Sequence, residues 1–423
     1  MKELTEDLYK IWNPFLIVSM ILLGMIYKTY FANIYYPTYY SANDSRTLFE
    51  TVTLCLDWKE KYGIEISDGE IEGIAAQYQK ELNTLSEEIY ALSMSNTEMQ
   101  KRGINSYESW QHFIDGFTEP TDDQRQEFLN AEVMIQTIVN NTRIQKVNVI
   151  KRVLQNYEIV KDPEKAYEYY VQPVVFDRLS PGYGEKVRER IYEISNSDMR
   201  FGYIPQELVH YINSYFRVMT TWVIITISVL LSVSFYANHN QRRNVCRKCS
   251  ILTSMERTYQ VHIISGIITA IAITIITYTL YWIPLFRMDL IKFVDFQMSS
   301  SLLSPWFSWF NGTFGDYLAA FFAIALIMGI STALFVIAAL YSSRNRICAL
   351  LKVLIVSTTM GIVLNHCILH QFPDIYNYLR KLTGIPIFPY ITLGLLLLVG
   401  IGINFLVMSY MKNGQGHMSD KIQ

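Results

Sequence analysis

Charged residues are scarce in this chain: Asp, Glu, Lys and Arg make up 17% of its 423 residues. Soluble domains usually contain about 25%. Positive and negative charges nearly cancel, to a formal net charge of −2, so no excess of basic residues favours binding to nucleic acid. Cysteine is also rare. Cys55 is the only cysteine in the polar stretch 34–216, which excludes a disulfide within that stretch.

Motifs that carry chemistry are missing as well. The chain has no Gly-x-x-x-x-Gly-Lys-Ser/Thr loop to hold a nucleoside triphosphate, and no His-Glu-x-x-His or Gly-x-Ser-x-Gly motif. Cys246 and Cys249 form a lone Cys-x-x-Cys pair, whereas a structural zinc site needs four ligands. His366 and His370 can share a helical face, which is more typical of an interfacial pair than of a metal site. We therefore expect no catalytic residue, metal or cofactor on this chain.

Long apolar segments are what the chain does have. Each is close to the ~20 residues that a helix needs to cross ~30 Å of hydrocarbon. They run from about Trp12 to Phe31, Val218 to Tyr236, Val261 to Ile283, Tyr317 to Tyr341, Ile347 to Leu369 and Pro389 to Met411. The sequence thus predicts an all-α polytopic membrane protein with six transmembrane helices. The first is expected to be a retained anchor, because no small-residue cleavage site follows it.

The region between the first two spans reads as a large, mostly helical domain. We divide the chain into residues 1–33 with the first span, the domain at 34–216, and spans two to six at 217–423. Ser67 and Glu70 have the spacing of a capping box, and an apolar stripe with helical periodicity follows them. Pro205 suits the first turn of a helix that continues unbroken into the second span. The best strand candidate is Val171–Phe176, although Pro173 weakens it.

Basic residues in the short loops predict the orientation. Arg242, Arg243 and Arg247 lie in the turn after the second span, and Arg344 and Arg346 in the turn after the fourth. Clustered Lys and Arg in short loops mark the cytoplasmic side of a membrane. Both termini should then be cytoplasmic and the domain at 34–216 extracytoplasmic, as in the cell membrane of a bacterium.

The spans offer almost no groups that could bind a driving ion. Carriers driven by protons or ions need ionisable or coordinating groups near the middle of the membrane. Asn404 is the clearest polar residue there. Energy should therefore enter from a partner, and the inner loop 237–260 is the only sizeable place for docking. It either holds such a partner through Ile251, Leu252 and Met255, which can share a helical face, or merely fixes the topology.

Several short stretches carry a resemblance to a known family. Two are the inner turn Leu252–Arg257 with the following His262–Gly266, and the polar break Tyr341–Arg346. The most specific is an outer loop and helix start that contain Gln297, Ser304, Pro305, Gly315 and Tyr317. With the order of the spans, these stretches resemble permease subunits of the ABC type-2 superfamily, in the variety common in Gram-positive bacteria.

The resemblance implies a pair of permeases, identical or different, with two cytoplasmic ATPase subunits that bind ATP and magnesium. In such transporters a short inner helix couples the ATPase to the spans. Here that helix would contain Ile251, Leu252, Met255, Glu256 and Arg257. The family usually has Gly-Arg followed by further Lys residues at this place, and Glu256 and His262 depart from that pattern.

Two functions remain open at this point. One is an export permease for an amphipathic cargo, such as a peptide, an antimicrobial or a lipid, with ATP hydrolysed on a separate subunit. The other is a non-transporting sensor or immunity protein whose outer domain binds a ligand. The lack of any kinase or other output module counts against the second function.

Overall fold

The computed structural model describes residues 2–39, 42–115, 131–139, 141–170, 182–196, 200–245, 252–286, 290–303, 306–343, 345–368 and 388–419. The chain forms two compact units. Unit 1 holds Met1–Asn33, His210–Val294 and Gly315–Gln423, and unit 2 holds Ile34–Val209 and Asp295–Phe314. Residues 295–314 thus group with the polar region, although more than 80 residues of unit 1 separate the two along the chain.

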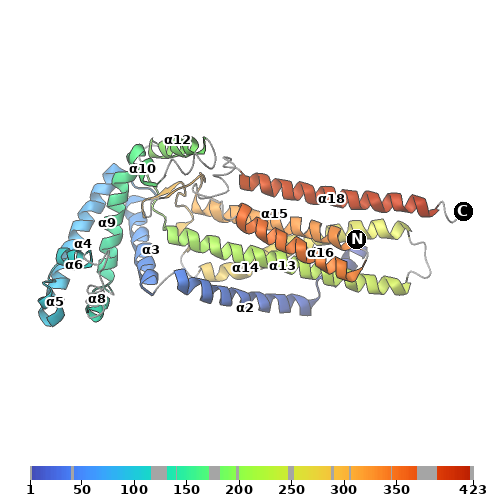
Figure 1. Ribbon diagram of the computed structural model, residues 1–423, viewed down its shortest axis with the longest axis horizontal. Helices are drawn as coiled ribbons and strands as arrows, with labels where there is room; N and C mark the ends of the chain where they lie inside the picture. Colours follow the sequence, from blue (N-terminus) through green and yellow to red (C-terminus); the bar gives the residue numbers. More distant parts are fainter. Residues whose placement is uncertain are drawn as a thin grey trace. The chain divides into compact units, whose positions relative to one another are not determined.

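Unit 1 is built from long helices (Figure 1). They are α1 (Lys2–Ile11), α2 (Pro14–Tyr39), α13 (Gln206–Val245), α14 (Leu252–Phe286), α15 (Phe314–Tyr341), α16 (Arg346–Ile362) with the π-helical turn η2 (Val363–Ile368), and α18 (Phe388–Ser419); a short 3₁₀ turn, η1, covers Leu290–Phe293. Among the described residues, five helices are long and apolar enough to cross a membrane. The bent pair α1 and α2 makes a sixth if it is counted as one span. The prediction of a multi-pass helical protein is confirmed to that extent.

The first span has a break that the apolar run did not predict. Helix α1 ends at Ile11 and α2 begins at Pro14, with a bend of 41° between them. Proline lacks an N–H, so it is tolerated at the first position of a helix but not in its interior. The Asn13 side chain accepts a hydrogen bond of 3.0 Å from the Phe15 N–H, which satisfies a donor at the start of α2.

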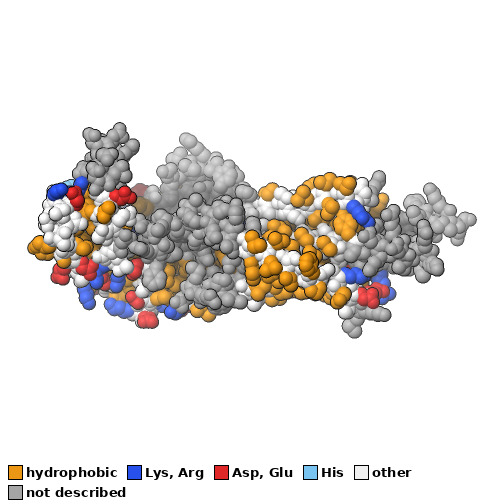
Figure 2. All heavy atoms as spheres, turned by 90° about the horizontal axis from the view of Figure 1, so that it is seen from below, with side chains coloured by type: hydrophobic (Ala, Val, Ile, Leu, Met, Phe, Trp, Pro, Cys, Tyr) orange, Lys and Arg blue, Asp and Glu red, His pale blue; other side chains and the backbone are white. Residues whose placement is uncertain are grey.

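The core of unit 1 is formed by α13, α14 and α15. Val223, Ile227, Ile273 and Ile337 are buried there. In contrast, α16 and α18 leave most of their apolar side chains exposed, among them Leu350, Leu354, Leu398, Phe405 and Leu406. On the face seen in Figure 2, hydrophobic side chains form a broad orange surface over the bundle. An apolar surface of this extent is typical of contact with lipid or with another membrane helix.

Unit 2 is mostly helical, as the periodicity predicts. Its helices are α3 (Ala42–Tyr62), α4 (Asp68–Ser95), α5 (Thr97–Lys101), α6 (Tyr107–Asp115), α8 (Glu132–Val139), α9 (Thr142–Val160), α10 (Pro163–Tyr170) and α12 (Tyr183–Asn196). Helix α9 lies against both α3 and α4. The capping box at α4 is confirmed, because the Glu70 carboxylate accepts a hydrogen bond of 2.9 Å from the Ser67 N–H. The predicted strand Val171–Phe176 lies outside the described residues.

Residues 295–314 form a small hairpin within unit 2. Strands β1 (Ser300–Ser301) and β2 (Trp306–Phe307) pair antiparallel. The Asn156 side-chain amide donates to the Leu302 carbonyl at 2.7 Å, and the Leu302 N–H donates to the Gly202 carbonyl at 2.9 Å. A Cβ atom on Gly202 would lie 2.6 Å from the Ser300 carbonyl oxygen, so only glycine allows this close approach.

Candidate functional site

The residues predicted to couple the chain to an ATPase lie at the start of α14. The helix begins at Leu252, so Leu252, Met255 and Glu256 are in its first turns, and Ile251 lies outside the described residues. Helix α13 continues to Val245, so the described parts of the predicted loop 237–260 are helical. The first turns of α14 are therefore continuous with the candidate membrane span Arg257–Leu280 of the same helix.

Helix α1 is attached to this end of α14 by charged side chains. Arg257 forms an ion pair with Glu3 at 2.9 Å, and both side chains are more than half exposed. One turn further along each helix, His262 Nδ1 and a carboxylate oxygen of Asp7 are 3.0 Å apart. Unlike the outer pair, Asp7 and His262 are buried, with exposed fractions of 7% and 1%. Exposed ion pairs usually contribute little to stability. The buried contact, in contrast, holds a side chain of α1 directly against one of α14.

A second buried polar contact joins α14 to α18 and α15. The Tyr259 hydroxyl donates a hydrogen bond of 2.6 Å to the Asn404 side-chain carbonyl oxygen. The Asn404 amide in turn donates to the Leu334 carbonyl at 3.0 Å and to the Gly400 carbonyl at 2.7 Å. In an apolar interior a polar side chain is stable only when its donors and acceptors have partners. Asn404 meets that requirement by bridging three helices.

Together these contacts form a polar node, which we define as Asp7, Tyr259, His262 and Asn404. The node lies within three turns of the start of α14 and connects that helix to α1, α15 and α18. The sequence pointed to Asn404 as a mid-span polar residue, but it gave no reason to pair His262 with Asp7. The available signal was a histidine inside an apolar run, since buried ionisable residues in spans almost always have partners.

The residues that carry the family resemblance lie in two places. Gln297 forms an antiparallel bridge with Thr313 inside the hairpin region of unit 2. Gly315 and Tyr317 are in the first turn of α15, where the Gly315 N–H donates to the Val294 carbonyl at 2.7 Å and Tyr317 is buried. Ser304 and Pro305 lie outside the described residues. Of the described motif residues, Gln297 thus belongs to the hairpin region, and Gly315 and Tyr317 belong to the start of α15.

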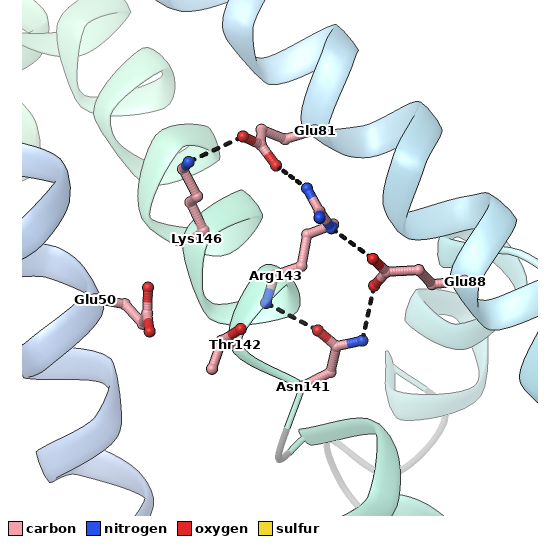
Figure 3. A pocket seen from close by; sticks show the side chains of 7 residues that line it. All are labelled: Glu50, Glu81, Glu88, Asn141, Thr142, Arg143 and Lys146. Carbon is pink, nitrogen blue, oxygen red and sulfur yellow. Dashed lines mark hydrogen bonds and ion pairs between the residues drawn. The ribbon is translucent and has the colours of Figure 1, made fainter. Parts of the chain in front are cut away.

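A polar cleft of about 240 Å³ lies between α3, α4 and α9 in unit 2 (Figure 3). Arg143 joins two carboxylates of α4, with Glu81 at 2.5 Å and Glu88 at 2.8 Å. Lys146 pairs with the second oxygen of Glu81 at 2.9 Å. The Asn141 amide donates to Glu88 at 3.0 Å, while its carbonyl oxygen caps α9 by accepting from the Arg143 N–H at 2.8 Å. Glu50 of α3 completes the lining.

Electrostatics hold this network in one protonation state. Partial burial opposes ionisation of Glu81, but Lys146 and Arg143 outweigh it and lower the pKa of that carboxyl. The hydrogen bond to Glu88 and the contacts with Glu81 raise the pKa of Arg143 further. At neutral pH the Glu81 carboxylate is therefore ionised beside Arg143 and Lys146, and the charged side chains of the cleft could bind a charged group.

The remaining candidate residues concern metal binding and thiols in the part of the chain that the structure describes. No group of three or more His, Cys, Asp or Glu side chains is placed there to hold a metal ion. Cys55 is buried and Cys348 is exposed, and neither forms a disulfide with a described residue. Cys246, Cys249 and His370 are outside the described residues.

Comparison with known proteins returns nothing. No family model, curated protein or solved structure matches this chain.

Proposed function

We propose that this protein is the membrane-spanning permease subunit of an ATP-driven ABC transporter. It exports an amphipathic cargo, such as a peptide, an antimicrobial or a lipid, while a separate cytoplasmic subunit binds and hydrolyses ATP with magnesium. The observation that supports this proposal best is the polar node. It joins the helix that starts at the expected coupling residues to three further helices.

The proposed mechanism follows from that connection. Leu252 and Met255 contact the ATPase, and closure of the ATPase subunits displaces the start of α14. Because the node joins α14 to α1, α15 and α18, those helices move with it. Ser357 of α16 donates a hydrogen bond to Ser228 of α13 at 2.8 Å, so α16 also lies against the second span. A change in the packing of these helices opens and closes the path of the cargo.

The proposed orientation rests on the basic residues of the short loops. The start of α14 and both termini face the cytoplasm, and unit 2 faces outward, in the membrane of a bacterial cell. A second permease, identical or different, completes the transporter. The exposed apolar sides of α16 and α18 face lipid or that second subunit.

A sensor or immunity protein remains the alternative, and the cleft of unit 2 is the observation that would favour it. Such a protein would bind its ligand outside and would need no ATPase. The permease therefore requires an ATPase partner, and the sensor or immunity protein does not.

Purification of the tagged full-length chain from its native membrane distinguishes them. The permease proposal expects a subunit with a phosphate-binding loop, encoded near this chain, to co-purify in a fixed ratio, and expects the complex to hydrolyse ATP. If the chain instead purifies as a homogeneous folded protein with no nucleotide-binding subunit from several detergents, the permease proposal is wrong and the sensor function is favoured.

A further inference from the structure

We propose that the cleft between α3, α4 and α9 binds the positively charged end of a basic side chain, the ammonium or guanidinium group of a cationic peptide, through Glu50. Binding at this cleft does not depend on the partnership with an ATPase. If the proposed function is also correct, the cleft narrows the class of cargo to peptides that carry Lys or Arg.

The side chains that line the cleft carry more negative than positive charge. Three carboxylates line it, against one guanidinium and one ammonium group. The two cations are both committed to carboxylates of α4, with Glu81 shared between them. Glu50 makes no ion pair or hydrogen bond with any described residue of the chain. One negative charge is thus left uncompensated at the wall formed by α3.

The position of Glu50 and the size of the cleft favour a small cationic group. Figure 3 shows Glu50 reaching from α3 towards α9, while the ion-paired network occupies the wall on the side of α4. The cavity of about 240 Å³ is smaller than the ~300–1,000 Å³ of clefts that enclose drug-sized ligands. It has room for a single side chain rather than for a whole cargo molecule. Because Glu81, Glu88, Arg143 and Lys146 already hold one another in place, little conformational freedom is lost on binding.

The same facts argue against other ligands. An anion would have to displace Glu81 or Glu88 from Arg143 and would face the charge of Glu50. A calcium or magnesium ion prefers six or more oxygen ligands, and Glu50 is the one carboxylate here not already paired with a cation. A monovalent organic cation needs only that single carboxylate and neighbouring hydrogen-bond acceptors, such as the Thr142 hydroxyl.

The test uses the full-length protein in detergent and a fluorescently labelled tri-lysine peptide. The neutral comparison is the same peptide with its three lysines acetylated, which keeps the length and removes the charge. We expect wild-type protein to bind tri-lysine at least tenfold more tightly than the acetylated peptide, and Glu50→Gln to lose most of that preference. Glu72→Gln is the matched control, because Glu72 is an exposed carboxylate of the same unit outside the cleft.

Several results would overturn the proposal. They are equal binding of the two peptides by wild-type protein, an unchanged preference in Glu50→Gln, or an equal loss in Glu72→Gln, which would mean that general surface charge is responsible. Thermal unfolding shows whether each variant is folded. Glu50→Asp keeps the charge and should retain part of the preference for tri-lysine, which provides a second test if Glu50→Gln proves unstable. If Glu50→Gln loses the preference and no ATPase co-purifies with the wild-type chain, the cleft binds cations but the transporter proposal is wrong. The two proposals can therefore fail separately.

Discussion

The hydroxyl of Tyr259 and the side-chain carbonyl oxygen of Asn404 lie 2.6 Å apart, although 145 positions separate them in the sequence. Both side chains are buried, with exposed fractions of 0% and 5%. This contact joins α14, which begins at the expected coupling residues, to α18. Its contribution to the free energy of unfolding can be measured by substitution of either residue.

Replacement of Tyr259 by Phe should destabilise the protein by about 1 kcal/mol, because it leaves the Asn404 carbonyl oxygen without its donor. Asn404→Leu removes three hydrogen bonds and should cost more. The double variant should lose less than the sum of the single losses, since both act on one contact. Thermal or denaturant unfolding in detergent measures these differences. Additive losses would mean that the two residues are not coupled.

A substitution of Gly202 tests the attachment of the hairpin in unit 2. Gly202→Ala puts a Cβ atom 2.6 Å from the Ser300 carbonyl oxygen, where the backbone cannot easily shift, so we expect a loss of roughly 1–3 kcal/mol. Gly69→Ala is the control, because the space around its Cβ position is open. Unfolding temperature and protease resistance provide the measurements. Equal stability of the two variants would contradict the described packing of residues 295–314.

Much of this fold can be predicted from sequence because its signals are local. The apolar segments, the capping box at Ser67 and the unbroken helix α13 each depend on neighbouring residues, and the structure confirms them. The pairing of Asp7 with His262 could not be predicted in this way. It brings together side chains from α1 and α14 that no local periodicity relates.

Of the two candidate sites, one could be predicted from a local sequence pattern and the other could not. The residues Leu252 and Met255 could be proposed from an apolar pattern in the sequence, and the structure adds that they belong to the first turns of a long helix. The cleft of unit 2 was missed, because Glu50, Glu81 and Arg143 come from three helices and look like ordinary surface charges in the sequence. Only the tertiary fold leaves Glu50 facing a network in which the other charges are paired.

The stability of unit 2 should depend on pH through Glu81. The pKa of this carboxyl is lower in the folded protein than its ordinary value of about 4.3, so the unfolded chain binds more protons near that pH. The stabilisation is therefore complete above about pH 5 and is lost as the pH falls through the folded pKa. Glu81→Gln should be less stable by about 1 kcal/mol at pH 7, a difference that disappears at low pH.

Unfolding temperatures of wild type and Glu81→Gln from pH 7 to pH 3 measure this effect. Glu132→Gln is a suitable control, because Glu132 is exposed and lies outside the cleft. A constant difference between wild type and Glu81→Gln across the whole range would show that the ion pairs with Arg143 and Lys146 do not stabilise the fold.

The proposed topology can be tested with native and introduced cysteines. Cys348 is exposed at the start of α16 and should face the cytoplasm, whereas Ala76 is exposed on α4 and should face outward. In a background without other cysteines, an impermeant maleimide should label Ala76→Cys in intact cells and should label Cys348 only after permeabilisation. Labelling of Cys348 from outside would reverse the orientation and place the start of α14 away from any ATPase.

The most direct test of the central claim measures whether the ATPase subunit is held through the first turns of α14. Met255→Asp or Leu252→Asp would bury an unpaired charge in the contact, at a cost on the order of several kcal/mol. Ser250→Asp, on the opposite face of the expected coupling helix, should cost much less. With equal membrane insertion of all variants, co-purification of the ATPase should fall sharply for the first two and stay near wild type for the third. Wild-type yields of ATPase with both Met255→Asp and Leu252→Asp would contradict the account.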